Sequence, residues 1–126
     1  MDAVVRQRGA VERSGATTDA IAQRLSAGDR AFFESNFVAQ QKMFAGILGW
    51  LECAVRANLT ADPAEIRNQA RRAAGEFNRI RAAQQLASQG EWKDWYRGDR
   101  KMNLASAEKL TQAVLELAER TAGAKE

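Results

Sequence analysis

The 126-residue sequence contains no histidine, one cysteine and one proline. Without histidine, imidazole zinc sites, Ser-His-Asp triads and histidine acid–base catalysis are excluded. The lone Cys53 cannot form an intramolecular disulfide, and its place in an apolar stretch predicts a buried, unreactive thiol. A single proline in a chain rich in Ala, Gln, Arg, Glu and Leu favours helices. We therefore predict an all-α protein that needs no metal ion and no cofactor.

Charge is nearly balanced, with 19 Lys and Arg residues against 16 Asp and Glu residues and a net charge of +3. The N-terminus lacks the apolar core of a secretory signal. The most apolar run, residues 43–55, is shorter than the roughly 20 residues of a membrane-spanning helix, and Glu52 interrupts it. We expect a cytoplasmic protein without a membrane span.

Residues 1–16 show no sustained hydrophobic period and combine charged side chains with two glycines. We expect a frayed or disordered lead there, followed by a single helical-bundle domain over residues 17–126. A short helix is expected to begin at Thr17 or Thr18, where a threonine hydroxyl can cap it.

Three longer helices follow in the sequence. Residues 26–29 have the spacing of a capping box and predict the start of a long helix over about 28–59. The sequence Asp-Pro-Ala-Glu at 62–65 predicts the start of a second long helix over 63–89. A last helix is expected over 104–122. The predicted fold is a three-helix bundle, made of a long antiparallel pair and a C-terminal helix, with a short extra N-terminal helix.

Alternating steps of four and three residues predict the buried face of each helix. On the first long helix the expected core residues are Phe33, Phe37, Gln40, Phe44, Ile47, Leu51 and Ala54. On the second they are Ile66, Ala70, Ala73, Phe77, Ile80, Gln84 and Ala87. On the last they are Ala107, Leu110, Val114, Leu117 and Thr121.

The first long helix is apolar on more than one side, and Gly46 and Gly49 within it favour tight packing. Such a helix needs more than one neighbour, which indicates either a central place in a bundle or an interface with another protein. The candidate interface residues are Phe37, Phe44, Leu48 and Trp50.

Residues 91–103 form a connector in which aromatic and basic side chains alternate. The candidate ligand-binding residues there are Trp92, Trp95, Tyr96, Arg97, Arg100 and Lys101. Aromatic rings can stack on sugars, and arginine can bind anions, so a carbohydrate or anion site is one interpretation. The same aromatic spacing also suits one helical turn that closes the core. The connector's acidic residues, Glu91, Asp94 and Asp99, have no spacing that defines an acid–base pair.

Five arginines lie on the helix expected over 63–89: Arg67, Arg71, Arg72, Arg79 and Arg81. They could face phosphates, so weak nucleic-acid binding is another alternative. Because Glu65 and Glu76 interleave with them, a solvated charged flank is the favoured interpretation.

Residues 77–115, and above all the string EWKDWYRGDRKMNL at 91–104, resemble a helical segment near the C-terminal end of some bacterial carbohydrate-active enzymes. The resemblance covers about a third of the chain. It implies an accessory or interaction helix pair, because 126 residues cannot contain a catalytic (β/α)₈ barrel of about 250.

No set of residues competent for catalysis stands out in the sequence. We therefore predict a non-catalytic helical module that acts by packing against a protein partner or a second copy of itself. The alternatives are an accessory domain that binds carbohydrate or anions through 91–103, and weak nucleic-acid binding through 63–89.

Overall fold

The computed structural model describes residues 1–88 and 103–123, and each regular element within them is a helix. In chain order the elements are α1 (Asp2–Ala22), α2 (Ala27–Phe33), the π-helical segment η1 (Glu34–Val38), α3 (Ala39–Asn58), α4 (Pro63–Ala87) and α6 (Leu104–Gly123). The segments α2, η1 and α3 follow one another without a gap. They form one continuous helical rod, and the all-α class is confirmed.

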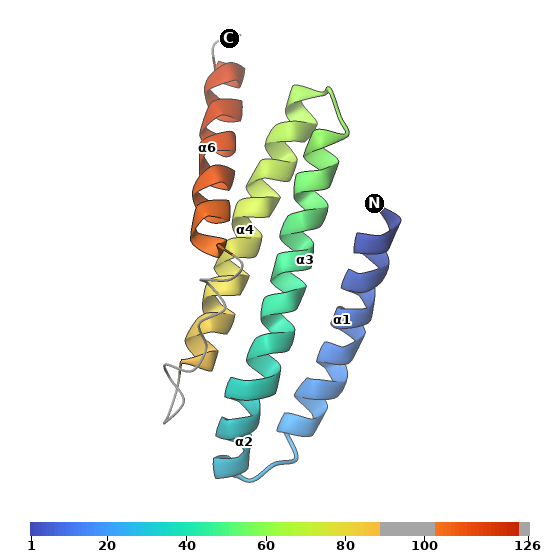
Figure 1. Ribbon diagram of the computed structural model, residues 1–126, viewed down its shortest axis with the longest axis vertical. Helices are drawn as coiled ribbons and strands as arrows, with labels where there is room; N and C mark the ends of the chain where they lie inside the picture. Colours follow the sequence, from blue (N-terminus) through green and yellow to red (C-terminus); the bar gives the residue numbers. More distant parts are fainter. Residues whose placement is uncertain (89–102, 124–126) are drawn as a thin grey trace.

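Figure 1 shows α6, α4, α3 and α1 side by side in this order. At the centre, α3 and α4 form an antiparallel hairpin, which the sequence predicts as the long helix pair. Helix α1 packs mainly on α3, and α6 packs mainly on α4. None of the described helices is both long enough and apolar enough to cross a bilayer. The hairpin is therefore the central element on which the two outer helices rest.

The N-terminal helix is longer than expected. It begins at Asp2 and not at Thr17 or Thr18, so the lead expected over residues 1–16 is helical almost throughout. Counting the rod of α2, η1 and α3 as one, the described residues form four helices, where we expected three with a short extra one.

Two residues of the expected lead have roles inside α1. Gly15 is buried, and a Cβ atom there would lie 2.5 Å from Nε2 of Gln41 on α3, so the glycine permits close packing. The hydroxyl of Ser14 donates to the backbone oxygen of Val11 at 2.8 Å, a bond made within the helix. Gly15 therefore serves packing and Ser14 serves local hydrogen bonding, although the composition of residues 1–16 suggested disorder.

The two predicted helix starts with capping residues are confirmed. The Ser26 side chain accepts a hydrogen bond from the backbone N–H of Asp29 at the start of α2. At the start of α4, the Asp62 carboxylate accepts from the backbone N–H of Ala64 at 2.9 Å. Pro63 follows the cap, at a position where a missing N–H costs no helical bond.

A π-helical turn interrupts the long rod where periodicity predicts one regular helix. The backbone N–H of Ala39 bonds to the oxygen of Glu34, five residues earlier. The side chains of Ser35 and Asn36 donate to carbonyls of the preceding turn at 2.9 and 2.8 Å. Because a π turn contains an extra residue, it changes the register between α2 and α3.

The face of α3 that packs on α4 carries small residues. The buried apolar and glycine positions of α3 are Ala39, Met43, Gly46, Gly49 and Cys53. A Cβ on Gly46 would lie 2.7 Å from Cγ1 of Ile80, and one on Gly49 would lie 2.6 Å from Cδ of Glu76. The two helices therefore approach so closely that the two glycines leave no space for a side chain.

The core stripe predicted for α4 is confirmed at five of its seven positions: Ala70, Ala73, Phe77, Ile80 and Ala87 are buried, and Ile66 and Gln84 are half-buried. The stripe predicted for α3 is wrong, because Phe37 and Phe44 are each 54% exposed. Both sides of α3 are apolar. The side that carries the glycines is buried, because it allows the closer approach to α4.

The inward face predicted for α6 is wrong at its leucines, although Ala107 is partly buried and packs against the core. Leu110 and Leu117 are 65% and 57% exposed, and Leu104 and Thr111 are buried instead. Leu104 joins the core cluster of Met43, Phe77, Ile80 and Ala83. Helix α6 thus contacts the hairpin mainly through its first turns, so the leucines farther along it stay open to solvent.

We predict that Gly46→Ala lowers the free energy of unfolding by about 1–3 kcal/mol, because the added methyl group collides with Ile80 in a packed seam. The matched control is Gly75→Ala on α4, where nothing lies within 4 Å of the new Cβ. There alanine should raise stability by up to about 1 kcal/mol through its higher helix propensity. Urea unfolding followed by circular dichroism measures both changes, and equal effects would contradict the close approach.

Candidate interaction surface

Four phenylalanines lie along the rod formed by α2, η1 and α3, and together we call them the aromatic face: Phe32, Phe33, Phe37 and Phe44. Phe32 is 52% exposed, and Phe37 and Phe44 are each 54% exposed. The rings of Phe33 and Phe37 stack with centroids 5.1 Å apart and an interplanar angle of 23°. Aromatic residues are enriched in the buried centres of protein interfaces.

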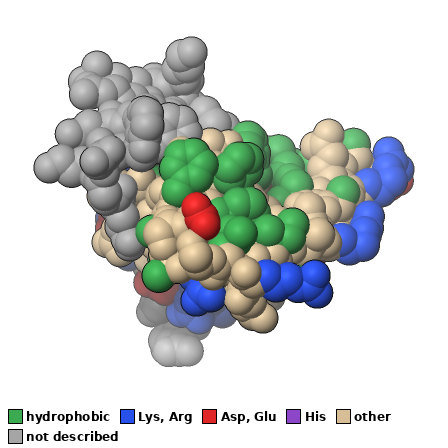
Figure 2. All heavy atoms as spheres, turned by 90° about the horizontal axis from the view of Figure 1, so that it is seen from below, with side chains coloured by type: hydrophobic (Ala, Val, Ile, Leu, Met, Phe, Trp, Pro, Cys, Tyr) green, Lys and Arg blue, Asp and Glu red, His purple; other side chains and the backbone are tan. Residues whose placement is uncertain are grey.

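Figure 2 views the molecule from the end that carries α2. Apolar side chains gather there into a patch that encloses one acidic side chain, and Lys and Arg side chains lie at its edge. An apolar centre with a charged rim has the anatomy of a protein–protein contact surface.

The structure separates the four expected interface residues into two groups. Phe37 and Phe44 lie on the aromatic face, seven residues apart, and Leu48 is half-buried one turn farther along α3. Trp50 belongs to the core instead: its Nε1 donates to Oγ1 of Thr111 at 2.9 Å, and its ring meets Phe77 edge-on at 5.9 Å. Trp50 therefore joins α3 to α4 and α6.

Phe32 is also more than half exposed, although it was not among the expected interface residues. Periodicity alone assigned Phe33, Phe37 and Phe44 to the core and did not include Phe32 in that stripe. The signal that could have found it is the run of two adjacent phenylalanines just after the Ser26 cap. In a helix, adjacent residues point in different directions, so both phenylalanines cannot be fully buried against one neighbour.

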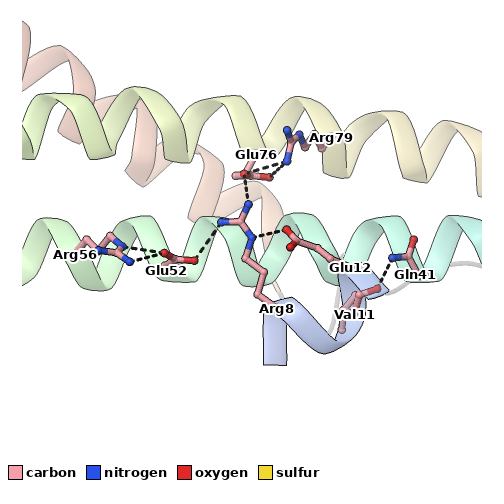
Figure 3. Close-up of polar contacts among 8 residues, drawn as sticks. All are labelled: Arg8, Val11, Glu12, Gln41, Glu52, Arg56, Glu76 and Arg79. Atoms are coloured by element: carbon pink, nitrogen blue, oxygen red, sulfur yellow. Dashed lines mark hydrogen bonds and ion pairs between the residues drawn. The ribbon is translucent and has the colours of Figure 1, made fainter. Parts of the chain in front are cut away.

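A group of ion pairs around two buried glutamates connects α1 to the hairpin (Figure 3). Arg8 of α1 reaches between two glutamates, with Nη1 3.1 Å from Oε2 of Glu52 on α3 and Nη2 3.9 Å from Oε1 of Glu76 on α4. Its Nε donates to Glu12 at 2.8 Å. One arginine thus contacts carboxylates from three helices.

Each of the two buried glutamates has a second arginine partner. Arg56 lies 2.8 Å from Glu52, and Arg79 lies 3.3 Å from Glu76. With Arg8 and Glu12 included, three arginines meet three carboxylates, so the formal charges cancel. The two buried glutamates are tolerated because each has arginine partners in this way.

Burial alone would raise the pKa of Glu52, but hydrogen bonds from Arg56 and Arg8 outweigh burial and hold that pKa below its ordinary value of 4.5. Burial would lower the pKa of Arg8, yet its hydrogen bonds to Glu12 and Glu52 raise that pKa. Both shifts favour the charged forms. The cluster is therefore suited to permanent ion pairing and not to proton transfer.

Helix α1 depends on these polar contacts because it buries few side chains. Its buried residues are Gly15 and Ala22, neither of which brings a large apolar group. A further polar contact comes from α3, where Nε2 of Gln41 donates to the backbone oxygen of Val11 at 2.8 Å. The position of α1 is therefore determined largely by Arg8 and by this amide.

Cys53 is buried in α3, as expected from its apolar surroundings. Burial raises the pKa of its thiol, with a smaller opposing influence from Arg72. A raised pKa disfavours the reactive thiolate. Within residues 1–88 and 103–123, no cluster of three Cys, Asp or Glu side chains could hold a metal ion.

The six candidate ligand-binding residues of the connector lie outside the described residues, as do Glu91, Asp94 and Asp99. The arginines of α4 can be placed. Arg71 pairs with Glu119, Arg79 with Glu76 and Arg81 with Glu108. This pairing supports the interpretation of a charged flank over that of a phosphate-binding row.

No protein-family model matches this chain, and no curated protein or solved structure matches it either. The similarity of residues 77–115 to segments of carbohydrate-active enzymes therefore stays a prediction. What the chain does has to be argued from its own surfaces.

We predict that Arg8→Met lowers the free energy of unfolding by about 2 kcal/mol, because it leaves Glu52 and Glu76 with one arginine each in a poorly hydrated place. The control is Arg71→Met, which breaks an exposed pair with Glu119 and should cost less than about 1 kcal/mol. Chemical denaturation of both variants measures the difference. A loss for Arg8→Met no larger than that of the control would show that the cluster does not hold α1.

Stability should fall as the pH is lowered below about 4.5. Because the pKa of Glu52 is lowered in the folded state, its charged form stabilises the fold at every pH above the ordinary pKa of 4.5. This contribution disappears as the pH falls through the folded-state pKa. Glu52→Gln lacks that contribution, so its stability should change less between about pH 5 and pH 3. Thermal unfolding at a series of pH values compares the slopes, and parallel slopes would contradict the assignment.

Proposed function

We propose that the chain is a non-catalytic helical module that acts by packing against another protein, and that the aromatic face is its contact surface. One observation supports this most directly: three phenylalanines on one continuous helical rod are each more than half exposed. Complete burial of a phenylalanine side chain is favourable by about 1.5–3 kcal/mol. A partner that covers these rings therefore gains substantial binding free energy.

A second copy of the chain is the simplest partner. In a twofold dimer the same surface of each copy meets the other, so one aromatic face would suffice for both sides. The continuous rod formed by α2, η1 and α3 is suited to pack side by side with its own symmetry mate, as helices do in bundles.

We expect sedimentation equilibrium to show association above the 13.9 kDa monomer as the concentration rises. The double variant Phe37→Ser/Phe44→Ser should weaken this association at least about tenfold, since truncating central aromatic residues commonly costs more than 2 kcal/mol. Its unfolding free energy should stay close to that of the wild type, because the two rings are more than half exposed.

The matched control is Leu59→Ser, which removes a 73% exposed leucine at the opposite end of α3 and should leave association unchanged. A chain that remains monomeric up to high concentration would contradict self-association. A photo-crosslinking residue at position 37, compared with one at position 59, then tests for a different protein partner. Equal crosslinking yields at the two positions would contradict the aromatic face as a contact surface.

A further inference from the structure

Helix α6 is apolar on two sides, and the hairpin covers one of them. On the covered side, Leu104 and Thr111 are buried. On the open side, Leu110 and Leu117 are 65% and 57% exposed, and Val114 between them is 40% exposed. Steps of four and three residues separate these three side chains, which is the spacing of a buried helix face. We call them the leucine stripe, and a stripe of this kind suits one more helical neighbour.

A small apolar groove lies beside the leucine stripe, between α3, α4 and α6, with a cavity volume of about 140 Å³. No Lys, Arg, Asp or Glu is among its described lining residues. An apolar protein cavity of about 150 Å³ accepts benzene, so the groove has room for a leucine side chain. On α3 the lining extends from Trp50 to Asn58, about 12 Å along the helix, and the leucine stripe extends over about 10 Å of α6. The groove and the stripe therefore match in length and in chemistry.

Two exposed charges lie on the side of α6 away from this groove. Lys109 and Glu116 are seven residues apart, and neither forms an ion pair with any described residue of the chain. The midpoint between these two charges and the midpoint of the leucine stripe both lie within one residue of Ala113. A twofold axis near Ala113 would therefore align opposite charges and leucines at the same time.

We propose that the leucine stripe and the groove bind a second copy of this chain, with the two α6 helices antiparallel about a twofold axis near Ala113. Each copy places its stripe against α6 and the groove of the other, so one contact covers both apolar surfaces. Lys109 of each copy then meets Glu116 of the other, and these charges set the register. This contact uses no residue of the aromatic face, so it and the proposed function can fail independently.

The first test is disulfide cross-linking of the full chain through Ala113→Cys, in the Phe37→Ser/Phe44→Ser background in which the aromatic face cannot contribute. Mild oxidation should give a linked dimer, since the two copies of residue 113 face each other across the axis. Cys53 is buried and does not compete. The matched control is Ala105→Cys, also exposed on α6, whose two copies lie about 24 Å apart along the helix axes. Its yield should be at least about tenfold lower, because a disulfide needs Cα atoms within about 7 Å.

Sedimentation equilibrium in the same background measures the strength of the contact. We expect a dimer and no larger species. Adding Leu110→Ser and Leu117→Ser should weaken it at least about tenfold, and both side chains are more than half exposed, so the fold should persist.

A charge exchange tests the antiparallel register. Lys109→Glu should weaken the dimer about threefold or more, because two pairs of like charge replace two pairs of opposite charge. Adding Glu116→Lys should restore the affinity, since the exchanged charges again attract across the axis.

Three results would overturn the proposal: equal cross-linking at positions 113 and 105, a dimer that the serine substitutions in the leucine stripe leave unchanged, or no recovery in the charge exchange. A chain whose association disappears completely in Phe37→Ser/Phe44→Ser would support the aromatic face and also overturn this second contact.

Discussion

The close approach of α3 and α4 at Gly46 and Gly49 is the contact on which the remaining arrangement depends. At these positions the space that a side chain would take is occupied by Ile80 and Glu76. Close-packed interiors gain dispersion energy from many short contacts, so a seam of small residues can hold two helices as firmly as a seam of large ones. Once this side of α3 is buried, Phe44 on another side of the same helix faces outward.

The outer helices are attached to the hairpin by different kinds of contact. Helix α6 inserts Leu104 into the apolar core and holds Trp50 through Thr111. Helix α1 contributes almost no apolar burial and is placed by Arg8, whose guanidinium joins carboxylates of α3 and α4. A charged contact requires exact partners, whereas an apolar one requires mainly shape. The position of α1 is therefore more sensitive to single substitutions and to acid.

Local signals in the sequence were sufficient where one residue type has one physical role. The caps at Ser26 and Asp62 satisfy backbone N–H groups that any helix start leaves free, so they mark the same boundary in sequence and structure. The stripe on α4 was correct because that helix is apolar on one side alone, and a single apolar side can only face the core. Periodicity failed for Phe37 and Phe44, which it placed in the core and which are each more than half exposed.

The sequence by itself therefore determined the helical class, two of the helix starts and the inward face of α4. Only the tertiary structure decided which side of α3 is buried, because periodicity cannot rank two apolar sides and the choice depends on how closely α4 can approach. It likewise decided that α1 is helical from Asp2. Arg8 holds this helix against the hairpin through Glu52 and Glu76, which are far away in the sequence. Contacts between distant residues have no periodic signal, and they alone bring the indole of Trp50 against Thr111 and Phe77.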